Sequence, residues 1–382
     1  MCITKTQSGL RSYYKLAIAG SAAYAMSTLF SAMKPILLTR FLEQAEVVES
    51  LAGLTVAMPF VGIASAAICM RGYLLRAPYK GIVLVFGSLL IGLELASSLV
   101  HDNLLVVLLA QYLCGISVGI LMGTASRYIA MTNNPGQLFG FVDMMAVFLM
   151  SFMVYGVGVS VEFNGLTGGY LFAGIVSAIF TVMMLAYRSD SQVLVEDDNS
   201  TGEFIVGVRQ LTTVLMSVLF VTCSGLGFAF MFSLARSLNM SYDTAGTNIG
   251  ILLFLSAFAC MAGGWASAKF GPVRPIAAAC VTCALGWCAA IYAPNTELFL
   301  LALVPAVFSL QFNFPILLAL CGSLDEYGRW ASVATPLITS GFAWAAILAG
   351  QIVEFWGISA LAPATAIGMS GCLLLLWVSR KT

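Results

Sequence analysis

Long apolar segments alternate with short polar, glycine-containing or proline-containing breaks along the whole sequence. A helix needs about 20 apolar residues to cross the roughly 30 Å hydrocarbon core of a bilayer. The apolar segments reach that length, and we therefore predict twelve membrane-spanning helices. The predicted spans cover about residues 13–41, 51–70, 79–100, 103–130, 138–160, 166–187, 205–235, 246–268, 274–293, 297–321, 330–356 and 358–379.

The composition agrees with a membrane protein and excludes several other classes. Hydrophobic residues make up 60% of the 382 positions and charged residues 9%, whereas a soluble domain has about 45–50% and about 25%. The 17 basic and 17 acidic residues leave no net charge, and so no basic footprint for nucleic acid. His101 is the only histidine, which excludes a multi-histidine metal site. We expect an all-α polytopic membrane protein that is not an enzyme and uses no cofactor.

A polar segment near the midpoint divides the predicted spans into two sets of six. It holds several acidic residues, and we interpret it as a solvated cytoplasmic linker. The predicted organisation is an N-terminal six-helix bundle over residues 1–187, a central loop over 188–204 and a C-terminal six-helix bundle over 205–382.

The distribution of positive charge predicts the orientation, because loops rich in Lys and Arg stay in the cytoplasm. If the N-terminus is cytoplasmic and each span changes the side, fourteen Lys and Arg residues lie inside. Only Lys34, Arg40 and Arg236 then lie toward the outside. A missed span would scramble this pattern. We therefore predict that both termini are cytoplasmic in a plasma membrane, which is the inner membrane in a bacterium.

Weak similarity between the two halves indicates an internal repeat. Residues 38–42 (LTRFL), near the end of the first span, are echoed by residues 234–238 (LARSL), near the end of the seventh. Gly53 in the second span has a counterpart in Gly250 of the eighth. These offsets are all close to half of the chain, as expected for a transporter built from a repeat.

The segment between the eighth and ninth spans carries the sharpest match to a known family. Gly264, Lys269, Gly271 and Arg274 follow the pattern of the signature loop of the major facilitator superfamily, which the chain resembles over essentially its whole length. Ala268 stands where that signature normally has an acid, so the usual gating salt bridge lacks one partner here. The resemblance implies two pseudo-symmetric bundles, transport by alternating access, and Lys269 and Arg274 at a cytoplasmic gate.

The same resemblance implies that the first, fourth, seventh and tenth spans line a central cavity. Gln311 and Asn313 in the tenth span are about 200° apart on a helix, so they cannot both face one cavity squarely. Lys34 either extends to the outer headgroups or attracts an anionic group of a substrate. The candidate substrate-binding residues are Tyr24, Thr28, Ser31, Lys34, Gln111, Gln311 and Asn313.

Charged residues inside the predicted spans are costly and therefore candidates for function. Glu94, deep in the third span, is either a proton carrier or a structural hydrogen-bonding group to a neighbouring helix. Asp143 at the start of the fifth span and Arg127 at the end of the fourth lie near the same membrane face. They form either an ion pair at a gate or two independent solvated ends.

These features predict a secondary active transporter of a small neutral or amphiphilic organic solute. No glycine-rich phosphate loop ending in Lys-Ser or Lys-Thr is present, so a gradient rather than a nucleotide supplies the energy. Proton coupling is the favoured hypothesis, and the expected unit is a monomer in the lipid bilayer. A facilitative uniporter and a non-transporting membrane receptor remain alternatives.

Overall fold

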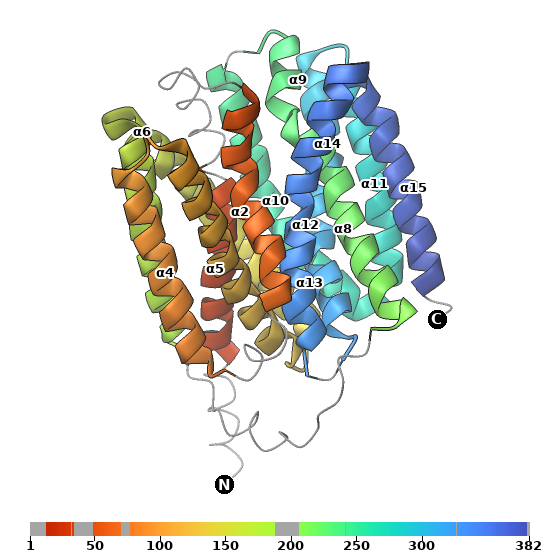
Figure 1. Cartoon of the computed structure of the whole chain (residues 1–382). Helices are drawn as coiled ribbons and strands as arrows, with labels where there is room; N and C mark the ends of the chain where they lie inside the picture. The colour runs from red at the N-terminus through yellow and green to blue at the C-terminus, as the bar shows by residue number, and fades with distance from the viewer. Residues whose placement is uncertain are drawn as a thin grey trace.

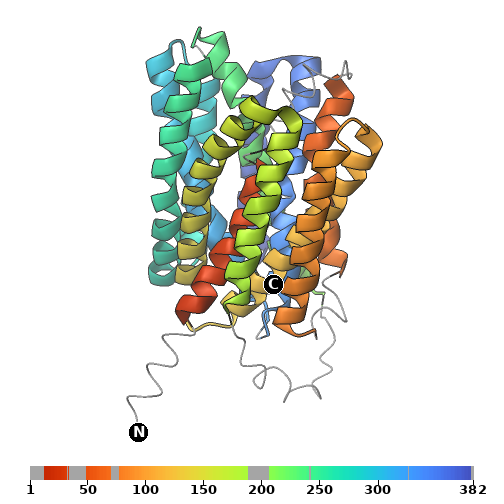
Figure 2. The same cartoon turned by 90° about the vertical axis from the view of Figure 1, so that its left-hand side faces the viewer.

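The computed structural model describes residues 13–31, 33, 49–69, 77–187, 206–240, 242–325 and 327–379. Within these ranges every regular element is a helix. The long helices run roughly along one axis and pack side by side (Figures 1 and 2). This arrangement confirms the predicted all-α fold class.

The first half of the chain begins with a helix over residues 13–31. Asn103 ends the loop before α5, where its side chain accepts a hydrogen bond from the amide of Val106 at 3.3 Å and caps the helix. The further helices of this half are α2 (Glu49–Cys69), α4 (Tyr79–Leu99), α5 (Leu104–Ala130) and α6 (Pro135–Leu185).

The 51 residues of helix α6 contain two of the predicted spans. Asn164 (φ −130°, ψ 17°) and Gly165 (φ 59°, ψ −146°) leave the helical region and reverse the direction of the chain (Figure 2). Positive φ costs glycine little, which explains the residue at this turn. The predicted spans at 138–160 and 166–187 are thus joined by two residues rather than by a loop.

The second half has more helices than predicted spans, because two spans are divided. The span predicted at 330–356 consists of α13 and α14, which meet after Pro336. The helices are α8 (Val208–Ala229), α9 (Met231–Ser237), α10 (Tyr242–Phe270), α11 (Val273–Ile291), α12 (Thr296–Gly322), α13 (Arg329–Thr339), α14 (Gly341–Trp356), η1 (Ile358–Ala360) and α15 (Leu361–Ser379).

Nine helical stretches among the described residues are long and apolar enough to cross a membrane. Counting the two arms of α6 separately, and adding α2 and the helix over residues 13–31, the arrangement accommodates the twelve predicted spans. We call the end where α5 finishes and α6 starts the lower end, and the end with the Asn164–Gly165 turn the upper end. The helix over residues 13–31 starts, and α15 finishes, at the lower end (Figure 1).

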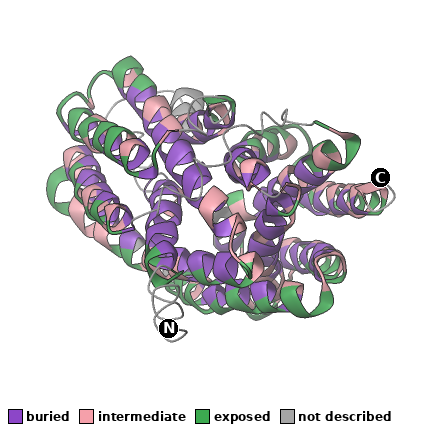
Figure 3. Cartoon of the chain, turned by 90° about the horizontal axis from the view of Figure 1, so that it is seen from below, coloured by how far each residue is buried: buried purple, intermediate pink, exposed green. Residues whose placement is uncertain are grey.

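Large apolar side chains cover much of the outer surface, as the membrane interior requires. Leu99, Phe163, Ile179 and Trp377 are all exposed on the isolated chain, and a soluble protein rarely shows so much contiguous apolar surface. Buried residues lie on the inward faces of the helices (Figure 3). Their main cluster draws side chains from both halves of the chain.

Candidate functional site

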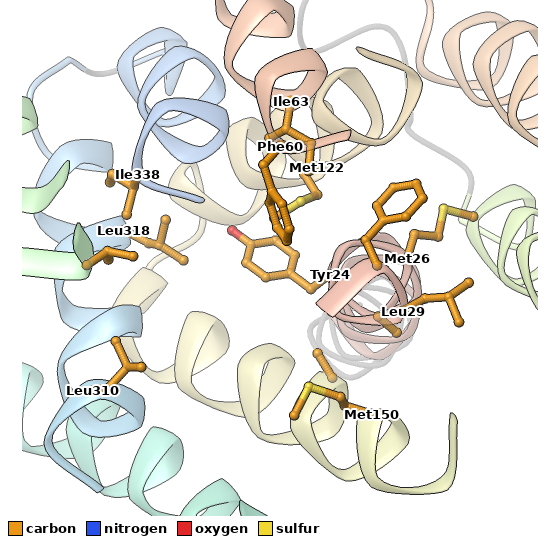
Figure 4. Close-up of a cluster of buried hydrophobic side chains, with 14 of the residues drawn as sticks. Tyr24, Met26, Leu29, Phe60, Ile63, Met122, Met150, Leu310, Leu318 and Ile338 are labelled. Carbon is orange, nitrogen blue, oxygen red and sulfur yellow. The ribbon is translucent and has the colours of Figure 1, made fainter. Parts of the chain in front are cut away.

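Tyr24, a candidate substrate ligand, is buried where helices from both halves meet. Its hydroxyl forms a hydrogen bond with the Ser126 hydroxyl of α5 at 2.8 Å, and Thr335 of α13 approaches the same group. The side chain points from the helix over residues 13–31 toward α12 and α13, which carry Leu318 and Ile338 (Figure 4). Tyr24 therefore connects the first span to the second half of the chain.

Asp143 lies in α6, a little over two turns from its start, and is only 4% exposed. Its carboxyl is close enough to the hydroxyl of Tyr24 and the thiol of Cys260 in α10 to interact electrostatically with both. The Oδ2 atom is buried and has no hydrogen-bond partner among the described residues. We call Tyr24, Ser126, Asp143, Cys260 and Thr335 the Asp143 site.

Of the two alternatives for Arg127 and Asp143, the ion pair is not formed in this conformation. The Arg127 Nε donates instead to the backbone carbonyl of Tyr327 at 3.2 Å, and so reaches from α5 to the loop before α13. Ser126, the preceding residue, already faces Tyr24, and one step along a helix turns the next side chain by about 100°. Arg127 therefore points away from Asp143 and toward the other half of the chain.

The two halves make close backbone contact just below Asp143, where α6 passes α10. A Cβ atom on Gly140 would lie 2.7 Å from the Cys260 carbonyl oxygen and 3.2 Å from the Cα of Gly264. A Cβ atom on Gly264 would meet the backbone of Gly136. Only glycine allows this approach, which keeps the lower end closed between α6 and α10.

Glu94 and Gln111 form a separate polar group inside the first half. The Gln111 Nε2 donates to Glu94 Oε2 at 3.3 Å and lies 3.4 Å from Ser97 Oγ, and all three residues are buried. A buried carboxylate needs such a donor, which explains why the Gln111 amide points to α4. The expectation that Gln111 faces a central cavity therefore does not hold in this conformation.

The other predicted substrate ligands are not gathered into one cluster. The Thr28 hydroxyl donates to the Ala25 carbonyl at 3.0 Å and lies 3.4 Å from the Ala146 carbonyl in α6, and Ser31 is half-buried. Gln311 Oε1 accepts a weak hydrogen bond from the Cys260 thiol at 3.8 Å, which places it beside the Asp143 site. Asn313 is fully buried, and neither amide atom has a hydrogen-bond partner among the described residues.

The remaining predicted residues lie at the lower end or outside the described part of the chain. Lys269 and Arg274 are exposed at the lower ends of α10 and α11, and the Lys269 ammonium lies 4.7 Å from the centre of the Trp265 ring. Neither contacts the first half through a hydrogen bond or ion pair given by the structure. Lys34 lies outside the described residues.

Tyr24 belongs to a buried cluster of apolar side chains from both halves. Phe60, Met122 and Met150 come from the first half, and Leu310, Leu318 and Ile338 come from the second (Figure 4). Methionine is flexible and adapts to ligands of different shape. A solute bound here would meet a mostly apolar wall with a few hydroxyl, amide and carboxyl groups.

Sequence reasoning did not identify Ser126, Cys260 or Thr335 as members of the site. Cys260 lies in an apolar run, where a cysteine usually packs as a small hydrophobic residue. The sequence signal that could have drawn attention to Ser126 is its neighbour Arg127, which is a candidate gate residue. Nothing in the local sequence of Thr335 indicates that α13 brings it to Tyr24.

Solved structures of several membrane transporters have a similar fold. The human organic anion transporter MFSD10 (TETRAN) superposes with a TM-score of 0.74 at 14% identity, covering 96% of this chain and 99% of that one. The proton:xylose symporter XylE, bound to 6-bromo-6-deoxy-D-glucose, gives a TM-score of 0.75 at 14% identity, with 97% and 96% coverage. The fucose:proton symporter FucP of E. coli gives 0.64 at 14% identity, with 96% and 99% coverage.

At the level of sequence, a search among curated proteins gave no significant match. A family model described as Major Facilitator Superfamily matches residues 16–324, which is most of the chain. The chain therefore belongs to the major facilitator superfamily of membrane transporters.

Proposed function

We propose that this secondary transporter moves a small neutral or amphiphilic organic solute by alternating access, and that protons drive the movement through Asp143. The unit of transport is a monomer in a plasma or bacterial inner membrane, with both termini in the cytoplasm. The observation that carries the proposal is a buried carboxyl group between the two halves whose Oδ2 lacks a hydrogen-bond partner among the described residues.

The environment of Asp143 suits a group that gains and loses a proton. An ionised carboxylate inside a membrane protein is costly without a counter-charge, and no ion pair reaches Asp143 in the described part of the chain. The neutral, protonated form is the one that this closed conformation accommodates. Contact with water would make the ionised form acceptable and release the proton.

The position of Asp143 couples its hydration to the movement of the two halves. It lies one turn above Gly140, whose backbone is in close contact with Cys260 of α10. Separation of α6 from α10 at the lower end would therefore open a path from water to the carboxyl group. Closure of the same contact would bury it again, as an alternating proton site requires.

In this proposal Glu94 is a structural group rather than a second proton carrier, because its surroundings differ from those of Asp143. It lies between α4 and α5 inside the first half, where Gln111 donates to it. Relative movement of the two halves would leave these neighbours in place, so the hydration of Glu94 would not change with the transport cycle. The alternative raised by the sequence, a hydrogen bond between helices, is the one that fits.

The surroundings of Tyr24 support a solute with substantial apolar surface. The side chains around it are largely aromatic, aliphatic or methionine, and no cluster of cations adjoins them among the described residues. Xylose, fucose and organic anions, named for the structurally similar transporters, define a first panel of probes. Neutral and amphiphilic members of the panel are expected to bind better than small polyanions.

The test begins with a thermal-shift screen of purified protein against D-xylose, L-fucose, a series of organic anions and uncharged amphiphiles, because ligands of the folded state raise the melting temperature. Each hit is then assayed for counterflow and for accumulation driven by a pH gradient in proteoliposomes. We expect Asp143→Asn to bind the hit and catalyse counterflow while losing pH-driven accumulation. Glu162→Gln, which changes an exposed acid on the same helix, is the matched control and should accumulate normally.

The outcomes separate the proposal from its alternatives. Saturable counterflow in the wild type that ignores the pH gradient would indicate a uniporter. Binding without any exchange of solute would indicate a receptor. Normal pH-driven accumulation by Asp143→Asn would remove Asp143 from the proton pathway.

A further inference from the structure

A groove of about 490 Å³ lies on the outer side of the second half, between α10 and α11. These two helices each pack extensively on α12 and only slightly on each other, so α12 forms the floor of the groove. Small residues on the walls keep it open. The lining includes Phe258 and Ala262 of α10, Ala278 and Thr282 of α11, and Pro305 and Phe312 of α12.

The groove opens toward the bilayer rather than toward the Asp143 site. Phe258, Ala262, Ala278 and Thr282 are exposed on the isolated chain, whereas Pro305 on the floor is half-buried. Almost all of the lining surface is apolar. Within a membrane such a surface must be covered by hydrocarbon, because water is absent there.

Two cations stand at the lower mouth of the same groove. On α10 the residues Phe258, Ala262, Trp265 and Lys269 follow a spacing of four, three and four, which keeps them on one face of a helix. On α11, Arg274, Ala278 and Thr282 follow a spacing of four and four. The cations therefore lie on the two faces that border the groove, about 10 Å along the axis from Ala262 in the case of Lys269.

Within the described residues, no acidic side chain pairs with either of these two charges. Both side chains are exposed, and neither forms an ion pair within the described part of the chain. No Asp or Glu occurs in the sequence between Asp243 and Glu297, which includes all of α11 and nearly all of α10. Trp265, in contact with Lys269, is an aromatic residue of the kind that prefers the headgroup level.

We propose that this groove is a binding site for an anionic phospholipid. One acyl chain lies along Ala262, Ala278 and Thr282, and the headgroup phosphate lies between Lys269 and Arg274. Basic pockets between spans at the cytoplasmic side of a membrane are suited to acidic headgroups. The assignment gives Lys269 and Arg274 a partner that the missing acid at Ala268 does not provide.

Charge also argues against a second copy of the chain as the occupant. A two-fold interface brings the same patch of both copies together. Lys269 and Arg274 of one copy would then face the same cations of the other, and like charges would repel each other. A zwitterionic lipid fits the apolar part of the groove but leaves the two cations with no net negative charge to bind.

The experiment measures lipid binding by the quenching of tryptophan fluorescence in purified protein held in neutral detergent. Phosphatidylglycerol with brominated acyl chains is compared with brominated phosphatidylcholine, and Trp265→Phe identifies the signal of Trp265. We expect roughly 30-fold tighter binding of phosphatidylglycerol, as two cations near an anionic headgroup provide. Lys269→Gln/Arg274→Gln should abolish that preference, and Ala278→Phe should weaken quenching by both lipids.

Matched controls make the same kinds of substitution at positions outside the groove. Lys80→Gln/Arg209→Gln removes two exposed cations at the lower ends of α4 and α8, and Leu285→Phe enlarges an exposed residue of α11 outside the lining. Both should behave like the wild type. Equal affinity for the two lipids, or an unchanged preference in Lys269→Gln/Arg274→Gln, would overturn the proposal.

Two further outcomes identify other occupants and would also overturn it. If glycerol phosphate without acyl chains competes as well as the lipid, the cations form a site for soluble anions and the groove plays no part. If light scattering shows a wild-type dimer that Ala278→Phe converts to a monomer, the groove is an interface between copies of the chain.

Discussion

Two buried acids of this protein have different surroundings, and the roles that we propose for them rest on this difference. Glu94 receives a hydrogen bond from Gln111 within one half of the chain. Asp143 lies between the halves, next to Tyr24 and Cys260, with Oδ2 unbonded among the described residues. In the proposed mechanism the first arrangement is structural, whereas the second holds the protonated carboxyl group.

Removal of the Gln111 amide should therefore destabilise the first half. Gln111→Leu withdraws a donor from a buried carboxyl group, and we expect a loss of about 1–3 kcal/mol in the free energy of unfolding. Thermal unfolding of the purified protein measures it. Glu94→Leu/Gln111→Leu should recover part of the loss, because neither partner of this hydrogen bond is then left unsatisfied, and Gln351→Leu at an exposed position is the control. Equal melting temperatures for Gln111→Leu and the wild type would contradict the structural role of this pair.

The sequence alone indicated how deep in the membrane these two acids lie, but it did not identify their partners. The length of an apolar run shows how far Glu94 and Asp143 lie from the ends of a span. It does not show how each helix is rotated about its axis. That rotation decides that Ser126 faces Tyr24 and that Arg127 reaches Tyr327, so the sequence alone left open whether Arg127 pairs with Asp143.

At the scale of helices, α6 and α10 bring the two halves into close backbone contact toward the lower end. Gly136 and Gly140 on one side meet Gly264 and the Cys260 carbonyl on the other. Such backbone contact between helices depends on small residues. The contact joins the two halves directly beside the proposed proton site.

A larger residue at this contact should shift the protein toward a conformation that is open at the lower end. We expect Gly140→Leu to lengthen the distance between spin labels placed at Lys80 and Arg209, one on each half. The measurement is a pulsed electron paramagnetic resonance experiment in a background without other reactive cysteines. Gly158→Leu, on the same helix where a Cβ atom has nothing within 4 Å, should leave the distance unchanged. An unchanged distance in Gly140→Leu as well would show that this contact does not hold the lower end closed.

The pattern of helices was largely predictable, because the length of apolar runs and the breaks between them follow from the bilayer. The turn at Asn164–Gly165 and the division of one span into α13 and α14 were not. Both depend on how neighbouring helices pack, and a single chain pattern does not contain that information. The residues of the Asp143 site come from the helix over residues 13–31, α5, α6, α10 and α13, so only the assembled fold brings them together.

For the molecule as a whole, the distribution of charge and the arrangement of the helices favour the same orientation in the membrane. Lys80 and Lys269 lie toward the lower end, and Glu162 and Glu354 lie toward the upper end, close to the ends of the helix segments that carry them. The lower end also carries the start of the helix over residues 13–31 and the end of α15 (Figure 1). It is the end that we predict to face the cytoplasm.

Labelling of single cysteines with a membrane-impermeant reagent tests this orientation in intact cells. We expect labelling at positions 162 and 354, and at positions 80 and 269 only after the membrane is permeabilised. The reverse pattern would invert the predicted orientation. Labelling of all four positions from outside would contradict the number of spans between them.

The two-residue turn of α6 has a practical consequence for observing the transport cycle. Its inner arm carries Asp143 and touches α10, whereas its outer arm packs beside α4 and shows Ile175 and Ile179 to the surroundings. Because only two residues join the arms, we expect a displacement of one arm to displace the other. A dye attached at Ile179 would then report, from the periphery, the motion of a carboxyl group that is buried in this conformation.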